Sequence, residues 1–141
     1  MSWYVCGLTL LIENSFCCGA LSCLLMNVYF VGIGSSVAYA ASKGALVTMT
    51  LSLARALGPI KINAVCPGFI QGEWLQEGLG AEAYDKMKAK IEKSNPLGKT
   101  STAEDIAKSI YFFAAEQQII TGETLIMDGG AHLAMATLSR R

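Results

Sequence analysis

From position 35 onward, apolar and polar residues follow one another in runs that predict helices and strands in turn. Residues 39–57 are strong helix formers with alanine, leucine and methionine on nearly every face, and Gly58-Pro59 cannot continue the helix. Residues 60–65 are short and β-branched and lead into Cys66-Pro67-Gly68, which predicts a buried strand that ends in a loop. A helix that is apolar all round is buried on two sides, either in a bundle or between a sheet and a second subunit.

Residues 73–94 predict an amphipathic helix. Its apolar positions Tyr84, Met87 and Ile91 recur at spacings of three and four residues. Acidic side chains come early in the segment and lysines late, as the helix dipole favours. The lysines are expected to form a solvated face.

A further helix is predicted from Ser101, because Ser101 and Glu104 have the spacing of a capping box. Its apolar stripe consists of Ile106, Ile110 and Phe113.

Residues 123–128 predict a last strand, which begins after Thr121-Gly122 and ends at Gly129-Gly130. The order helix, strand, helix, helix, strand indicates an α/β fold. Its parallel strands would be joined by helical crossovers.

The first part of the chain departs from this pattern. Residues 1–42 contain one charged side chain, Glu13, and residues 16–33 form an uncharged run of eighteen residues. That length raises the question of a membrane span, but no Lys or Arg precedes the run and polar and glycine residues dilute it. We therefore expect no membrane anchor and interpret residues 1–31 as an atypical apolar leader, replaced sequence, ahead of a globular segment at 32–141.

Composition excludes several classes of function. The eleven basic and eleven acidic side chains cancel, and no basic cluster interleaves with aromatic residues, which argues against a nucleic-acid partner. The five cysteines form no C-x-x-C pair and His132 is the single histidine, so a zinc site lacks ligands. The odd cysteine count favours a reduced, cytoplasmic protein.

Tyr39 and Lys43 are the residues most suited to chemistry. Positions four apart share one face of a helix, so the lysine ammonium can lie beside the phenol. A phenol has a pKa near ~10, and a cation at ~4 Å contributes ~4 kcal/mol at an effective dielectric constant of ~20, which favours the phenolate. Alone the pair is weak evidence, because many surface helices carry such a spacing.

The motifs around this pair raise its significance. Five of them occur in order, and over residues 32–133 the chain closely resembles the C-terminal half of the short-chain dehydrogenase/reductase family. They are Tyr39-Ala40-Ala41-Ser42-Lys43-Gly44-Ala45, Ile62-Asn63-Ala64-Val65-Cys66-Pro67-Gly68, Asn95-Pro96-Leu97-Gly98-Lys99 before Glu104-Asp105-Ile106-Ala107, Thr121-Gly122, and Asp128-Gly129-Gly130. The resemblance implies part of a Rossmann-like, doubly wound parallel sheet.

The resemblance also implies roles for particular residues. Tyr39 would be the general acid/base that exchanges a proton with an alcohol or ketone substrate, and Lys43 would assist it and bind the ribose of NAD or NADP. Pro67, Gly68, Phe69 and Ile70 match the loop that packs against the nicotinamide. Residues 73–94 match the mobile lid over the substrate, and the last strand with its Gly-Gly turn matches a usual subunit contact.

Three features of the family pattern are missing. No glycine-rich turn lies between a strand and a helix, and Gly32-Ile33-Gly34 is in another place. The position of the family's catalytic serine, thirteen residues before Tyr39, is Met26, or Phe30 if a short deletion is allowed. The threonine that often follows the Pro-Gly pair is also absent.

These departures lead to three hypotheses about function. The first is a truncated NAD(P)-dependent oxidoreductase that is inactive alone, since a full family member has roughly 250 residues. The second is a non-catalytic subunit that docks on full-length relatives or on itself through residues 45–57 and the last strand. The third is a membrane-tethered fragment. At least one apolar sheet edge would lack its usual partner strand, and residues 24–31 are the candidate for a substitute strand. Because such an edge exposes apolar surface, we expect self-association, strong ANS binding and non-cooperative melting.

Overall fold

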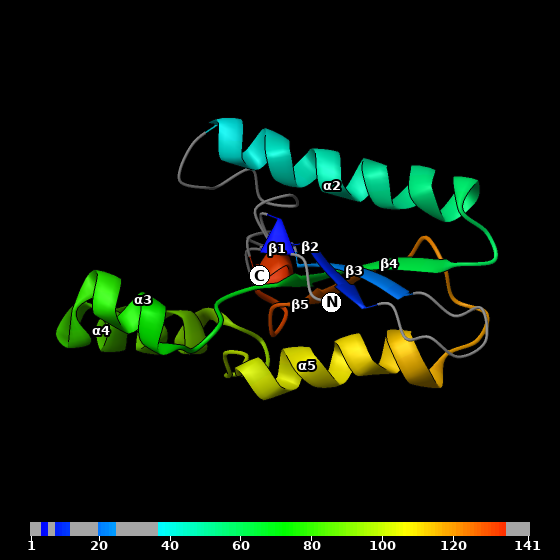
Figure 1. Ribbon diagram of the computed structural model, residues 1–141. Coiled ribbons are helices and arrows are strands. Elements are labelled where there is room, and N and C mark those ends of the chain that lie inside the picture. Colours follow the sequence, from blue (N-terminus) through cyan, green and yellow to red (C-terminus); the bar gives the residue numbers. More distant parts are fainter. Residues whose placement is uncertain (1–3, 6–7, 12–19, 25–36, 135–141) are drawn as a thin grey trace, which may run out of the picture.

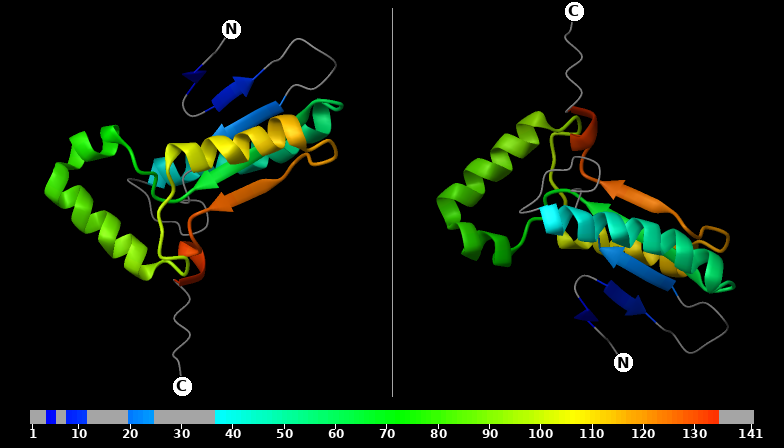
Figure 2. Two further views of the ribbon diagram at one scale, coloured as in Figure 1. Left: turned by 90° about the horizontal axis from the view of Figure 1, so that it is seen from below. Right: turned by 90° about the horizontal axis from the view of Figure 1, so that it is seen from above.

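The computed structural model describes residues 4–5, 8–11, 20–24 and 37–134. Five strands form one sheet in the order β1-β2-β3-β4-β5, with β1 and β5 at its two edges (Figures 1 and 2). Their bounds are Tyr4–Val5 for β1, Leu8–Leu11 for β2, Ala20–Leu24 for β3, Lys61–Pro67 for β4 and Thr124–Met127 for β5.

Strand direction divides the sheet into two parts. β3, β4 and β5 are parallel, with Cys23 opposite Ala64 and Ala64 opposite Thr124, whereas β1 and β2 run antiparallel to their neighbours. Parallel strands require crossovers, which the helices supply. The expected α/β fold with a parallel sheet is therefore confirmed. The strand that pairs with β4 is β3, Ala20–Leu24, rather than the expected strand over 24–31. Residues 25–31 lie outside the described residues.

Helix α2, Val37–Ala56, covers one face of this sheet (Figure 1). The helix lies close to its predicted bounds, 39–57. Leu46 and Val47 pack against Ala64 and Cys66 of β4. By length and composition α2 is the one described helix that could cross a membrane; here it lies along the sheet.

Helix α5, Ala103–Tyr111, and the π-helical turn η1, Phe112–Glu116, cover the opposite face (Figure 1). Ile106 and Phe113 are buried against Val65 of β4, as their stripe predicts. The result is a three-layer α/β/α arrangement.

The predicted capping box of α5 is wrong by one residue. Thr102, not Ser101, is the N-cap: the Asp105 amide donates to the Thr102 hydroxyl oxygen, and the Asp105 carboxylate accepts from the Thr102 amide at 3.0 Å. The reason is that Ser101 is engaged elsewhere, since its hydroxyl donates to the Met127 carbonyl at 3.2 Å.

The single helix predicted over 73–94 is interrupted. The structure has α3, Glu73–Leu79, and α4, Ala81–Ser94, which meet at Gly80 with φ of 79°. A side chain is strained in that left-handed conformation, so glycine permits the break. Both helices project beyond the carboxyl end of β4 (Figure 1).

Lys61, the first residue of β4, is buried beneath η1. Its ammonium donates to the carbonyls of Phe113 at 3.4 Å, Ala114 at 3.2 Å and Gln117. These carbonyls form the negative end of a helix dipole, so the cation is favourable there. Lys61 therefore ties one end of β4 to the crossover that follows it.

Candidate active site

Tyr39 and Lys43 lie one turn apart near the start of α2. The structure brings them together as their spacing predicts, with the Lys43 ammonium 5.3 Å from the centre of the Tyr39 ring. Lys43 is only 9% exposed, whereas Tyr39 is half-buried. A cation held over an aromatic face in a sheltered position is attracted by the ring and by developing negative charge on its oxygen.

The pair lies at the carboxyl end of β4. Residues 57–60 turn the chain tightly from α2 into β4, so the beginning of α2 lies over the end of the strand (Figure 1). Ligands of open α/β sheets bind at the carboxyl ends of strands. Tyr39 and Lys43 are therefore placed where such a fold has its binding crevice.

Pro67 and Gly68 end β4 in close contact with β5. The Gly68 amide donates to the Met127 carbonyl at 2.9 Å. A Cβ on Gly68 would lie 2.8 Å from the Cβ of Asp128, so a side chain there would displace the end of β5. Strand packing therefore requires a glycine at position 68, independently of any role in ligand binding.

Phe69 and Ile70 come directly after Gly68, and their side chains pack in different places. The Phe69 ring lies 5.6 Å from the ring of buried Tyr84 on α4, at an interplanar angle of 46°. Ile70 packs instead on the core of the α5 face and forms a bridge with Ser101. Of the two, Phe69 is the one in contact with the predicted lid.

A polar network that joins α4 to the two neighbouring loops was not predicted. The Gln71 amide donates to the Thr100 hydroxyl at 3.0 Å, and that hydroxyl donates to the Glu92 carboxylate of α4 at 2.8 Å. The three residues join the loop after β4 to α4 and to the loop before α5. Their separation in sequence left no local pattern to detect.

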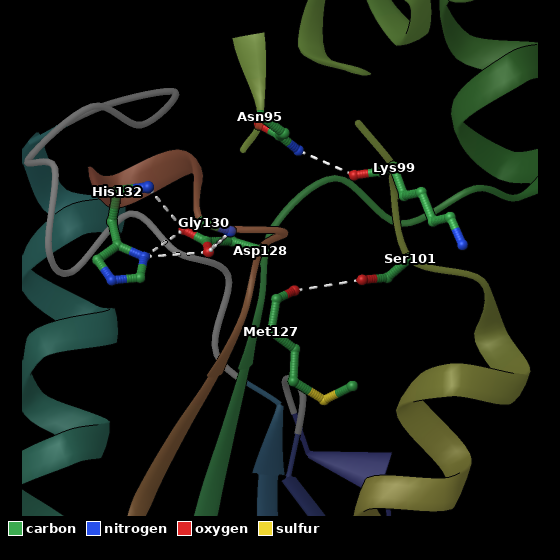
Figure 3. Close-up of polar contacts among 7 residues, drawn as sticks. All are labelled: Asn95, Lys99, Ser101, Met127, Asp128, Gly130 and His132. Carbon is green, nitrogen blue, oxygen red and sulfur yellow. Dashed lines mark hydrogen bonds and ion pairs between the residues drawn. The ribbon is translucent and has the colours of Figure 1, made fainter. Parts of the chain in front are cut away.

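A second unpredicted cluster lies where β5 ends. Asp128 is buried and its carboxylate accepts from the amides of Gly130 at 2.8 Å and His132 at 2.9 Å and contacts the His132 imidazole Nδ1 at 2.9 Å (Figure 3). Burial raises the pKa of Asp128, but these hydrogen bonds outweigh it and hold that pKa below its usual value. An aspartate directly before two glycines is a signal for such a turn.

The Gly129-Gly130 turn packs against the chain at the carboxyl end of α4. Both glycines have positive φ, and a Cβ on Gly129 would lie 2.8 Å from the Lys99 carbonyl. Asn95, the C-cap of α4, donates from its side-chain amide to that same carbonyl at 3.0 Å (Figure 3). The carboxyl end of α4 is therefore anchored to the end of β5.

Several expectations concern residues that the structure does not describe. Met26 and Phe30, the alternative positions for the family's serine, lie outside the described residues, as do Gly32 and Gly34. Most of the run 16–33 lies outside them as well. The division at 31/32 and the roles of the predicted site residues stay predictions.

Comparison with known proteins supports the family resemblance that the sequence motifs indicate. A sequence model of the family described as enoyl-(acyl carrier protein) reductase matches residues 15–132. The chain is 35% identical over 104 residues to 2-(S)-hydroxypropyl-CoM dehydrogenase 3 of Xanthobacter autotrophicus, which covers 71% of this chain and 41% of the relative. It is 34% identical over 103 residues to a 3-oxoacyl-[acyl-carrier-protein] reductase of Chlamydia pneumoniae, with 71% and 40% covered.

A solved structure agrees with these matches. A small-chain dehydrogenase in complex with NADPH superposes with a TM-score of 0.73 and 31% identity, over 82% of this chain and 52% of that one. The chain thus spans about two fifths of the curated relatives named above. On the strength of the sequence match, the motifs and the shared α/β arrangement, the chain belongs to the short-chain dehydrogenase/reductase family.

Proposed function

We propose that the chain carries the proton-transfer half of an NAD(P)-dependent oxidoreductase that interconverts an alcohol and a ketone. The observation that carries this proposal is the Tyr39–Lys43 pair, sheltered at the carboxyl end of β4. The related proteins, which include a ketoacyl reductase and a dehydrogenase, support the reaction class.

The donor set fits the nicotinamide-ribose half of the cofactor. Lys43 has three N–H donors for ribose hydroxyls, and Pro67 and Gly68 lie at the carboxyl end of β4, over which α2 begins. NAD(P)H, when bound, supplies the hydride that reduces the carbonyl carbon. Tyr39 gives its phenolic proton to the carbonyl oxygen, and the Lys43 charge stabilises the phenolate that remains.

We propose further that this chain alone is inactive. The proposal is supported by the sequence, which has no glycine-rich turn for the pyrophosphate and no serine at the Met26 position. Isolated chain should therefore bind NADH or NADPH weakly, with a dissociation constant above micromolar by calorimetry. A micromolar value for either nucleotide would contradict this part of the proposal.

The test is a chimera in which the N-terminal half of a close full-length relative, including its serine, precedes residues 32–141. Turnover should appear, and Tyr39→Phe should abolish it by removing the proton donor, while Lys43→Met should do nearly as much. Tyr111→Phe, which alters an exposed phenol on α5, is the matched control and should leave turnover unchanged. A Tyr39→Phe chimera that keeps most of its turnover would overturn the assignment.

A second candidate is a cytoplasmic, non-catalytic subunit that assembles with itself or with full-length relatives. It is supported by exposed apolar side chains on α2, where Leu51 is 56% and Met49 37% exposed, and by β5, which pairs on one side only within the described sheet. A pull-down with an active full-length relative separates the two candidates. The non-catalytic subunit should form a complex with the relative, and replacement of Tyr39 should not change the amount of complex.

A further inference from the structure

The loop that follows β4 lies between α4 and the core of the α5 face. At residues 69–71 it pairs with the segment before α5: the Ser101 amide donates to the Phe69 carbonyl at 3.2 Å, and the Gln71 amide donates to the Ser101 carbonyl at 2.8 Å. Successive side chains of such a paired, extended segment point to opposite sides. Ile70 packs on the core of the α5 face, so its two neighbours point to the side of α4.

Two contacts join α4 to this loop. The Phe69 ring lies 5.6 Å from the ring of Tyr84, which is buried. The Gln71 side chain donates to the Thr100 hydroxyl at 3.0 Å, and that hydroxyl donates to the Glu92 carboxylate at 2.8 Å. Tyr84 and Glu92 are about 12 Å apart along α4, at ~1.5 Å per residue. The loop is therefore joined to α4 at both an early and a late position of the helix.

The Thr100 hydroxyl is the junction of the second contact. A hydroxyl has one proton and two lone pairs, and a carboxylate only accepts. Because the Thr100 proton goes to Glu92, the lone pairs are left for the Gln71 amide, and the negative charge of the carboxylate strengthens the bond that it accepts. Both hydrogen bonds therefore depend on one hydroxyl group. A valine at position 100 keeps the shape of the side chain and removes both.

Helix α3 has no comparable contacts. It lies between Gly72 and Gly80. Of its residues whose exposure the structure describes, Leu75 is half-buried and the others are exposed. α3 is therefore the internal comparison for any change that affects α4.

We propose that Thr100 is a positioning residue that couples α4 to the loop at 69–71, so that a ligand resting on this loop also sets the position of α4. Thr100 acts through Gln71 and Glu92 and not by touching a ligand. The functional meaning rests on the proposed function. With the nicotinamide on the loop and the substrate against α4, the network makes binding of the first favour binding of the second.

Hydrogen exchange on the full chain tests the coupling. Thr100→Val should raise the exchange rates of the Gln71 amide and of the α4 amides at 88–94 together, about fivefold, because it breaks both bonds at once. The amides of α3 at 76–79 should not change. Thr100→Ser restores the hydroxyl and should return all rates to within about twofold of the native values. Thr48→Val, which removes an exposed hydroxyl on α2, is the matched control and should change none of them.

Glu92→Leu removes the acceptor of the same network without altering Thr100. Alone it should also raise the exchange rates of the Gln71 amide and of α4. Added to Thr100→Val it should change nothing further, because both variants remove the same bond. Additive effects, faster exchange in α4 with an unchanged Gln71 amide, or an equal rise in α3 would overturn the coupling. So would a Thr100→Ser variant that behaves like Thr100→Val.

The chimera that restores turnover tests the positioning role. Thr100→Val should raise the KM for the substrate about fivefold and change kcat less than about twofold, because the network acts on binding and not on proton transfer. Thr100→Ser should be close to native. An unchanged KM beside faster exchange would overturn the role. The proposed function fails by a different result, a Tyr39→Phe chimera that keeps its turnover, and the exchange rates of the full chain decide the coupling in either case.

Discussion

The two helical layers of the molecule use their apolar residues differently. On the α5 face, Ile106 and Phe113 are buried against β4, while the Tyr111 ring of the same helix is 60% exposed. On the α2 face, the two buried residues, Lys43 and Thr50, are polar, and apolar residues such as Leu51 remain exposed. The α5 layer therefore buries its apolar contacts to β4 completely, whereas α2 packs on β4 through the partly buried Leu46 and Val47 and leaves further apolar residues exposed.

The largest effect should come from emptying the core of the α5 layer. Phe113→Ala should remove about 4 kcal/mol of stability, because a buried aromatic side chain leaves a cavity. Hydrogen exchange of the β4 and α5 amides measures this without requiring a cooperative melt. Tyr111→Ala, which removes a 60% exposed ring two positions earlier, is the control and should change protection by less than about 0.5 kcal/mol. Equal effects would show that the α5 face is not a core.

A smaller effect is expected from Asp128→Asn, which removes a buried charge that is bound by three hydrogen bonds. The loss should be about 2 kcal/mol near neutral pH. Because the folded-state pKa of Asp128 is lowered, its stabilisation is present above the usual value of 3.8 and is lost as the pH falls through the lower folded value. Exchange protection at the end of β5 should therefore decline below about pH 4 in the native chain and stay flat in the variant. A parallel decline in both would contradict the role of Asp128.

The capping correction gives a still smaller effect. Thr102→Ala should cost about 1 kcal/mol and fray the first turn of α5, since it removes the hydroxyl oxygen that accepts from the Asp105 amide. Ser101→Ala should leave that turn protected and loosen the contact to Met127 instead. Exchange rates of the amides of residues 103–106 distinguish the two, and a reversed result would restore the cap predicted from sequence.

The smallest effect on stability should come from the outer side of α2. Leu51→Glu should change exchange protection by less than about 0.5 kcal/mol, because the side chain is 56% exposed. It should nevertheless reduce self-association in light scattering and ANS binding, since it places a charge on the apolar surface. Unchanged association would assign it to another part of the chain.

Much of the fold could be predicted because its signals are local. The long apolar helix, the short β-branched strand and the stripe of Ile106 and Phe113 depend on neighbouring residues alone. The cap was misassigned because Ser101 and Thr102 are both good caps with an acid three residues later, and only the contact to β5 decides between them. The break at Gly80 was missed because a helix also tolerates an isolated glycine, so the sequence alone does not mark the break.

The candidate site also has one part that follows from local sequence and another that does not. The Tyr39–Lys43 pair follows from helical spacing, so sequence placed it correctly in space. The Gln71–Thr100–Glu92 network and the contact of Gly68 with Asp128 join segments that are far apart in the chain. Such contacts depend on how strands and loops pack, which periodicity does not encode.

The three carbonyl groups that bind the Lys61 ammonium affect how the helical crossover between β4 and β5 ends at η1. The lysine acts as a built-in counterion, covalently tethered and permanently in place, for a helix end that lacks a capping glycine. A tethered ion loses no translational entropy when the helix forms, it cannot be diluted away, and salt screens a buried charge only weakly. The end of η1 should therefore depend little on the ionic composition of its surroundings.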